Sequence, residues 1–239
     1  MTRTTIPARR WLDHLRESFV ETWEGDEVEG VHQVRVAAGR LSIWLRLGGY
    51  RVLRDDLRWL RGTASEVRDI DVAISLDAST PMRDWLREER ERRRVELERR
   101  WRSPRIAGIL EAFELLPPLD VDLARRELKS LERKVKKIDK SLRKSPVSLD
   151  RMHDLRRALR RWRYALEWLD EPARRVKKMQ DSLGDLNDMR LVLTFLDLPH
   201  RPVGLDGHRN SVRNGLERRG QEARRNWLDE RDKLPWTTS

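Results

Sequence analysis

The stretch that decides the fold runs from His153 to Leu169 and reads HDLRRALRRWRYALEWL. Its apolar residues recur at spacings of three and four, the period of an α-helix, and no Gly or Pro interrupts it. On a helical wheel at about 100° per residue, one side is apolar and the other is cationic. The sequence therefore predicts an amphipathic helix with Leu155, Ala158, Leu159, Trp162, Leu166 and Leu169 on the core side and His153, Arg156, Arg160, Arg163 and Tyr164 on the outer side.

A second copy of this design lies at His32 to Leu47 and reads HQVRVAAGRLSIWLRL. Both copies begin with HxxR and repeat apolar residues at helical spacing. The same wheel places the two histidines at equivalent angular positions. It assigns Val34, Ala37, Ala38, Leu41 and Leu45 to the core side and His32, Arg35, Gly39, Ser42 and Arg46 to the outer side.

Another pair of matching segments follows the two helices, LRWLRGTASEVRDIDV at 57–72 and VKKMQDSLGDLNDMRL at 176–191. His153 follows His32 by 121 residues, and Asp188 follows Asp69 by 119 residues. An insertion or deletion of two residues is enough to explain this difference. We infer an internal duplication, diverged in sequence but preserved in layout.

Length and composition are those of a folded protein with a helical core. The chain has 239 residues, of which 38% are hydrophobic. It contains no run of eighteen apolar residues, and its first ten residues lack an apolar signal core, so we expect neither a membrane span nor an export signal. The absence of cysteine excludes disulfides and thiolate metal sites and agrees with a cytoplasmic location.

The net charge of +11 is concentrated in the repeated segments. Residues 31–61 carry seven Arg and two Asp, a net charge of +5, and residues 151–178 carry eight Arg, two Lys and four acids, a net charge of +6. The rest of the chain therefore balances to zero. A localised excess of this kind indicates an anionic partner.

The remaining segments also have helical patterns, and we find no convincing strand. A loop is expected at 25–30, and Pro81 is expected to close the first repeated unit. The segments 82–102 and 121–144 are highly charged and narrowly apolar, which predicts long, largely solvated helices. The further helices are expected at 6–24, 53–62, 67–76, 106–116 and 209–233, so the predicted fold class is all-α.

Four motifs together resemble the CHAD domain, a helical family named for its conserved histidines. They are VHQVRVAAGRL at 31–41, EVRDIDV at 66–72, MHDLRRALRRWRYALE at 152–167 and LGDLND at 183–188. The resemblance spans essentially the whole chain. It implies one domain over residues 1–239, built as two pseudo-symmetric antiparallel helical bundles from about 6–116 and about 121–233.

The resemblance also implies a function, the non-catalytic binding of inorganic polyphosphate in a basic groove or pore, with no cofactor. It implies a cytoplasmic protein associated with polyphosphate granules. No ExExK strand, the mark of the triphosphatase domain often fused to this family, is visible in the sequence. Carried over by position, the binding residues are His32, Arg35, Arg40, Arg46, Arg58, Arg61, His153, Arg156, Arg157, Arg160, Arg161, Arg163, Tyr164, Lys177 and Lys178.

The arginine spacing suits a long, uniformly charged anion. Arg156, Arg160 and Arg163 stand at i, i+4 and i+7, so they form a row that advances about 5.4 Å per helical turn. Guanidinium groups bind phosphate oxygens in pairs, whereas lysines act as point charges. At Gly39 and Ser42 related chains tend to carry basic residues, so we expect the first half to bind more weakly.

Each of these assignments has a structural alternative. An arginine row can be a solvated helix face with ion pairs, although Glu167 is the only acid on the same face of the second copy. His32 and His153 can be hydrogen-bonding residues at helix starts. Tyr164 can be a donor in the groove or a residue at the edge of the core. The polar residues of the second motifs, Asp69, Asp71, Asn187 and Asp188, can be metal ligands, helix caps or partners that orient arginines.

Two other functions remain open. The charge alone also permits a nucleic-acid-binding protein, with nucleic acid expected here only as a weaker competitor of polyphosphate. A metal-dependent phosphohydrolase using Asp69, Asp71, Asp188 and a histidine would need these groups to converge on one centre.

Overall fold

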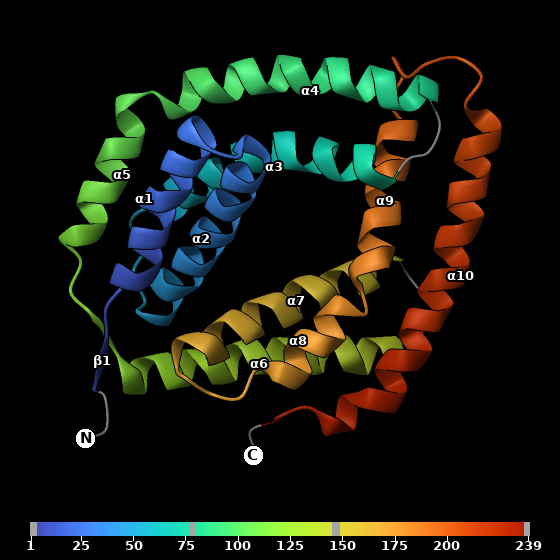
Figure 1. The fold of residues 1–239 in the computed structure, drawn as a ribbon. Helices are drawn as coiled ribbons and strands as arrows, with labels where there is room; N and C mark the ends of the chain where they lie inside the picture. The colour runs from blue at the N-terminus through green and yellow to red at the C-terminus, as the bar shows by residue number, and fades with distance from the viewer. Residues whose placement is uncertain (1–3, 77–79, 145–148, 237–239) are drawn as a thin grey trace. The chain divides into compact units, whose positions relative to one another are not determined.

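The computed structural model describes residues 4–76, 80–144 and 149–236. The chain divides into two compact units, residues 1–124 and residues 125–239. Helices dominate both units, which confirms the all-α prediction (Figure 1). None of the helices within the described ranges combines the length and hydrophobicity that a membrane span requires.

Unit 1 contains five helices among its described residues and the start of a sixth (Figure 1). These are α1 (Arg9–Glu24), α2 (Glu27–Leu47), α3 (Arg54–Leu76), α4 (Thr80–Trp101), α5 (Pro104–Glu114) and the first residues of α6 (Val121–Lys144). A short antiparallel pair, β1 (Thr5–Ile6) with β2 (Leu119–Asp120), departs from the strand-free expectation. Ile6, predicted to be helical, pairs with Leu119, and its carbonyl accepts a 3.0 Å hydrogen bond from Trp44 Nε1.

Helix α2 is the centre of unit 1 because it packs against both α1 and α3. It begins earlier than predicted, at Glu27, where the Asp26 side chain caps it by accepting a hydrogen bond from the Glu29 amide. Gly30, expected in a loop, lies inside the helix, and a Cβ there would be 2.6 Å from Thr22 Cα. The close approach of α1 and α2 therefore requires glycine at this position.

Packing on two sides also corrects the predicted outer face of α2. Gly39 was expected outside, but it is buried together with Ile43 and Trp44. A wheel assumes one apolar stripe, whereas a helix between two neighbours buries more of its circumference. The other residues of the predicted face, His32, Arg35, Ser42 and Arg46, keep partial exposure.

Helix α3 is continuous where two shorter helices were predicted. Gly62 lies within this helix, and a Cβ at that position would have no atom within 4 Å. Relative to alanine, the glycine costs the helix about 1 kcal/mol, which does not break it. Pro81, predicted to close the unit, instead lies in the first turn of α4, where a missing amide hydrogen costs nothing.

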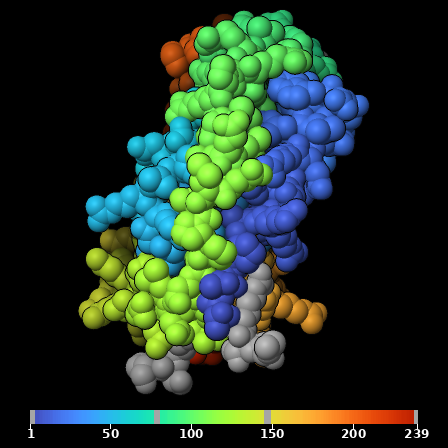
Figure 2. Space-filling model, turned by 90° about the vertical axis from the view of Figure 1, so that its left-hand side faces the viewer, coloured from blue at the N-terminus to red at the C-terminus, as the bar shows by residue number. Residues whose placement is uncertain are grey.

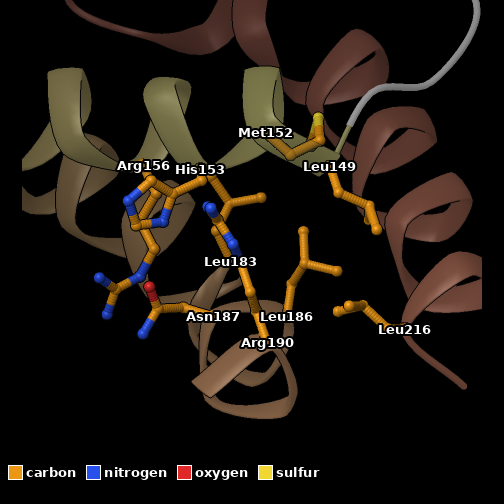
Figure 3. Close-up of a pocket in the computed structure, with 9 residues that line it drawn as sticks. All are labelled: Leu149, Met152, His153, Arg156, Leu183, Leu186, Asn187, Arg190 and Leu216. Carbon is orange, nitrogen blue, oxygen red and sulfur yellow. The ribbon is translucent and has the colours of Figure 1, made fainter. Parts of the chain in front are cut away.

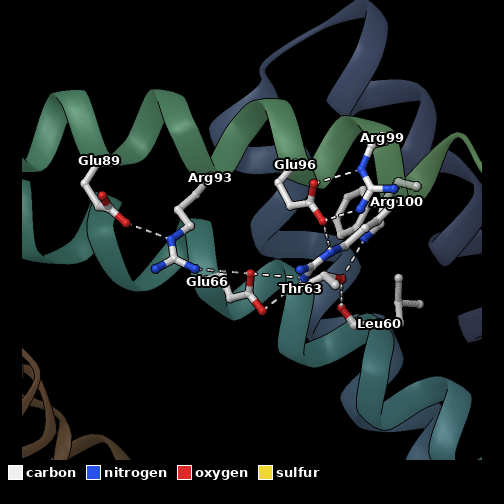
Figure 4. A network of polar contacts seen from close by, with 9 residues as sticks. Leu60, Thr63, Glu66, Glu89, Arg93, Glu96, Arg99 and Arg100 are labelled. Atoms are coloured by element: carbon white, nitrogen blue, oxygen red, sulfur yellow. Dashed lines mark hydrogen bonds and ion pairs between the residues drawn. The ribbon is translucent and has the colours of Figure 1, made fainter.

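Helix α4 is fastened to α3 by a few apolar residues and by polar contacts (Figure 4). Trp101 Nε1 donates a 2.8 Å hydrogen bond to Thr63 Oγ1 at a buried point. Arg100 lies 3.1 Å and Arg93 3.8 Å from carboxylate oxygens of Glu66. Much of the rest of the helix is exposed and carries ion pairs between its own residues, and Arg90 also pairs with Asp71 of α3 and Glu27 of α2.

Helix α5 lies between α1 and α3 on one face of unit 1 (Figure 2). Arg105 at its start bonds to Asp56 of α3 at 2.8 Å, and its guanidinium lies 4.2 Å from the Trp59 ring centroid. Glu114 at its end forms an ion pair with Arg16 of α1. Helix α5 begins at Pro104 and has a narrow apolar face, so these polar contacts help to hold it on unit 1.

Unit 2 contains the remainder of α6, then α7 (Leu149–Trp168), α8 (Arg174–Asp181), α9 (Gly184–Leu196), α10 (Asp206–Glu230) and a 3₁₀ turn (Arg231–Lys233). Helix α7 packs against both α8 and α10, and α9 packs against α10. The end of the chain is tied back onto the unit, because Trp236 stacks on the buried Trp162 with ring centroids 5.0 Å apart. Buried Asp139 of α6 accepts bonds from Trp227 and Arg231.

Candidate functional site

A small pocket in unit 2 is lined by the first turns of α7 and by α9 (Figure 3). The pocket is narrow, with a cavity volume of about 10 Å³, which is about the room that one water molecule needs. One wall is apolar, and the other is polar and cationic. The lining residues are Leu149, Met152, His153, Arg156, Leu183, Leu186, Asn187, Arg190 and Leu216.

The polar wall is built from two pairs of side chains, each spaced by three residues on its helix. His153 and Arg156 come from α7, and Asn187 and Arg190 come from α9. Residues three apart lie on the same face of a helix, so each pair points in one direction. Figure 3 shows the two pairs around the same space. The first and second motifs of the second copy, on α7 and α9, therefore lie together within unit 2.

In this pocket, the buried nitrogen atoms Nδ1 of His153 and Nη1 of Arg190 have no hydrogen-bond partner among the described residues. The other terminal nitrogen of Arg190 lies 3.2 Å from Asp150 Oδ1, which holds the guanidinium in place. A buried donor left unpaired costs about 1–3 kcal/mol, and an anion in the pocket would satisfy it.

The surroundings of His153 lower its pKa from the usual value. Burial is the largest cause, because it penalises the charged imidazolium. Arg190, Arg157 and Arg156 act in the same direction, and Asp154 opposes them. The free histidine is therefore neutral at pH 7, and it stands among cations that an anion would neutralise.

Unit 1 carries a similar arrangement around His32. Burial lowers the pKa of His32, followed by the positive charges of Arg68 and Arg35, with Glu29 acting in the opposite direction. His32 Nδ1 also lacks a hydrogen-bond partner among the described residues. In unit 1, Arg35 Nη1 donates a 2.9 Å hydrogen bond to Asp69 Oδ1 of α3.

The other predicted residues of unit 1 are spread over α2 and α3. The Arg40 guanidinium lies 4.1 Å from the Trp11 ring centroid. Arg46 and Arg61 are half-buried, and exposed Arg58 forms an ion pair with Asp55 on its own helix.

In unit 2 the predicted arginine row of α7 is shorter than expected. Arg156, Arg160 and Arg161 are partly exposed, and Arg157 is exposed. Arg163 and Tyr164, predicted to face outward, are only 8% and 7% exposed. Arg163 lies 3.4 Å from Glu167. The reason is the position of α7 between α8 and α10, which buries the last turns of the helix on several sides.

Lys177 and Lys178 do not reach the pocket at His153. They lie on α8 and line a separate open depression of about 1330 Å³, in which Lys177 forms a 2.6 Å ion pair with Asp181. We call it the basic depression; its lining residues are Arg174, Arg175, Lys177, Lys178, Met179, Asp181, Glu230, Lys233 and Leu234. Unit 2 therefore has two cationic surfaces where the sequence suggested one continuous row.

Two carboxylates lie close to cations of unit 2, which the helical wheel of α7 alone did not indicate. Asp154 is 2.5 Å from Arg157 one turn along α7, and Asp150 lies beside Arg190. Glu167 was expected to be the only acid on the same face of the second copy, and these acids reach the cations from outside that face. The wheel of one helix does not include acids that reach a cation from another helix or from an adjacent face.

The acids of the second motif in unit 1 act as partners of arginines. Asp69 accepts from Arg35, and Asp71 accepts a 2.5 Å hydrogen bond from Arg90 Nε. In unit 2, Asn187 lines the pocket, and its amide lies 3.5 Å from Asp188 Oδ1. Across the described part of the chain, no three His, Asp or Glu side chains form a group that could hold a metal ion.

Sequence reasoning missed two cations that surround the histidines, Arg68 and Arg190. Arg68 follows His32 by 36 residues, and Arg190 follows His153 by 37 residues. A basic residue at nearly the same distance in both copies was the available signal.

Comparison with known proteins agrees with this architecture. The chain resembles the CHAD domain from the plant Ricinus communis, with a TM-score of 0.67 and 20% identity over 98% of this chain and 90% of that one. It also resembles PptA from Streptomyces chartreusis, with a TM-score of 0.73 and 15% identity over 96% of this chain and 100% of that one. These likenesses concern the fold.

A search of curated proteins finds no match. The family model described as CHAD domain matches residues 8–197, which include all four motifs and both histidines. The match covers most of the chain, and the protein therefore belongs to the CHAD domain family.

Proposed function

We propose that the protein binds inorganic polyphosphate, without chemically altering it, through the pocket at His153 and the adjoining cations of α7. The observation that carries the proposal is the pair of buried, unpartnered nitrogen atoms, His153 Nδ1 and Arg190 Nη1, in a pocket whose polar wall is cationic. A phosphate group supplies the acceptors and the negative charge that such a pocket lacks.

The cationic residues at the mouth of the pocket offer contacts to one phosphate group, and the exposed part of α7 offers contacts to further phosphates of the same chain. Arg156 lines the pocket, and Arg160 follows it one turn along α7, about 5.4 Å away in rise. Arg157 and Arg161 stand on the adjacent flank of the helix with partial or full exposure. Successive phosphates of a flexible polyanion can therefore be met along the helix, and the basic depression on α8 supplies a further cationic surface.

Nucleic acid is a weaker candidate because α7 offers no stacking platform. Its aromatic residues, Trp162, Tyr164 and Trp168, are all buried. Proteins that bind single strands commonly stack exposed aromatic side chains on the bases, with about 1–3 kcal/mol gained per base. Nucleic acid would thus be held through its phosphates alone and would act as a competitor. We further propose that the protein is a cytoplasmic binding module located at polyphosphate granules.

The test is a competition titration in which long-chain polyphosphate and single-stranded DNA displace each other at matched phosphate concentration. Polyphosphate is expected to displace DNA, and the opposite ranking would favour the nucleic-acid hypothesis. Sustained release of phosphate from polyphosphate in the presence of a divalent metal would contradict a purely binding role.

A variant pair locates the site. Arg156→Gln with Arg160→Gln should weaken polyphosphate binding about tenfold or more, because each removes a charge-assisted phosphate contact. The matched control is Arg92→Gln with Arg99→Gln on α4, which removes the same charge from side chains 62% and 73% exposed. Equal losses in both double variants would show that binding is diffuse. Melting temperatures of all variants verify folding.

A further inference from the structure

The basic depression on α8 is much larger than the pocket at His153. Within its open space of about 1330 Å³ it has a cavity volume of about 720 Å³, whereas the cavity volume of the pocket is about 10 Å³. Sites for small molecules commonly measure about 300–1,000 Å³. The depression therefore has room for a compact ligand that the pocket is too small to enclose.

Two segments of unit 2 that are distant in sequence build the depression, α8 and the end of the chain (Figure 1). Arg175 Nη1 of α8 donates a 2.6 Å hydrogen bond to the carbonyl of Lys233. Further along, Trp236 stacks on Trp162 of α7, and its Nε1 donates to the carbonyl of Arg231. These contacts hold Lys233 beside α8.

The lining of the depression is strongly cationic. It carries five basic and two acidic side chains, a net charge of +3. Arg174 is followed at three and four residues by Lys177 and Lys178, so these cations lie along one side of α8. Among the described residues, the exposed side chains of Arg174 and Lys178 form no hydrogen bond or ion pair. Both can therefore contact an anion without giving up a partner in that part of the chain.

The two carboxylates of the depression are each paired with a lysine. Lys177 lies 2.6 Å from Asp181 at the end of α8, and Lys233 lies 2.6 Å from Glu230 at the end of α10. The hydrogen bond from Lys233 lowers the pKa of Glu230, which is therefore ionised at neutral pH. Carboxylates at the ends of both helices repel a polyanion that continues past them. A long chain thus gains less here than a short anion that ends before them.

We propose that the basic depression is a separate site for a compact oligophosphate of about three phosphate groups. Such an anion carries roughly four negative charges at neutral pH, close in size to the charge of the lining. Free tripolyphosphate and the triphosphate of a nucleotide share this chemistry. The site goes beyond the proposed function, because its ligand is short and its contacts are on α8 and the chain end.

The experiment is a calorimetric titration of the full chain with inorganic tripolyphosphate. Arg174→Gln with Lys178→Gln should weaken its affinity about tenfold or more, because each change removes a charge-assisted contact. The matched control, Arg92→Gln with Arg99→Gln on α4, removes the same charge from exposed side chains and should change the affinity by less than about twofold. Equal losses in the two double variants, or no saturable binding by the wild type, overturn the proposal.

A variant of opposite charge effect tests the carboxylates. Glu230→Gln removes a negative charge and releases Lys233 from its ion pair, so the affinity for tripolyphosphate should rise about threefold. The matched control, Glu91→Gln on α4, removes the same charge from a 2.7 Å pair with Arg94 and should have little effect. Equal gains from both changes, or a loss from Glu230→Gln at an unchanged melting temperature, contradict the proposed site.

Titration with long-chain polyphosphate separates this site from the proposed function. Arg156→Gln with Arg160→Gln should weaken the binding of long chains more than that of tripolyphosphate, and the α8 double variant should do the reverse. The same pattern of losses for both ligands would show one continuous surface and overturn a separate site. If the wild type binds tripolyphosphate but not long chains, the proposed function fails and this site stands, and the converse result removes only this site.

Adenosine triphosphate distinguishes the two sources of the ligand. Affinity higher than that of tripolyphosphate would assign the site to a nucleotide, and equal or lower affinity would assign it to free oligophosphate. Either result supports the site, provided that Arg174→Gln with Lys178→Gln weakens it. Binding of the nucleotide that this double variant leaves unchanged contradicts recognition through the phosphates.

Discussion

At the scale of single residues, the two histidines couple binding to pH. In the free protein, burial and then neighbouring arginines lower the pKa of His32 and His153. A bound polyanion favours the imidazolium, so the pKa of each histidine rises in the complex and binding takes up protons. Affinity should therefore increase as pH falls from 8 to 6. A rise of about one pKa unit per histidine corresponds to about tenfold in affinity when fully expressed.

The measurement is affinity at three pH values for the wild type and for His32→Gln with His153→Gln. The groups that face His153 are Arg156 and Arg157 of α7, Arg190 of α9 and the carboxylate of Asp154. A wild type with no pH dependence, or a double variant that keeps it all, would assign the histidines a structural role.

At the scale of elements, the attachment of α4 to α3 depends on one buried hydrogen bond more than on its ion pairs. Thr63→Val leaves Trp101 Nε1 without its 2.8 Å acceptor in a site where both residues are 3% exposed. We expect the free energy of unfolding to fall by about 1–3 kcal/mol. Glu66→Gln weakens half-exposed pairs with Arg100 and Arg93 and should cost about 0.5 kcal/mol or less. Urea unfolding of both variants measures the difference, and the reverse order would show that the ion network dominates.

At the scale of the whole molecule, the net charge of +11 predicts a strong dependence of binding on salt. Each phosphate that an arginine or lysine neutralises releases counterions, so a plot of log affinity against log salt should have a steep negative slope. Arg156→Gln with Arg160→Gln should reduce the magnitude of that slope by the equivalent of about two neutralised phosphates. The histidine double variant should leave the slope nearly unchanged at pH 8. A flat slope for the wild type would indicate a neutral pocket and contradict the polyanion proposal.

The sequence by itself determined the all-α fold class and the segments that hold the excess charge, and it indicated the internal duplication. Helical periodicity is local, so it survives without knowledge of the neighbours, and α6 has the bounds that its pattern predicts, Val121–Lys144. The HxxR motifs and their equal spacing also identified His32 and His153 as equivalent positions.

Only the tertiary structure decided which faces of those helices are accessible and which side chains meet. Gly39, Arg163 and Tyr164 are buried because α2 and α7 each pack against two neighbours, which a single wheel does not represent. Arg190 joins His153 from a helix 37 residues further along the chain. Burial and pairing depend on contacts between distant segments, and a periodic pattern in one helix carries no information about its partners.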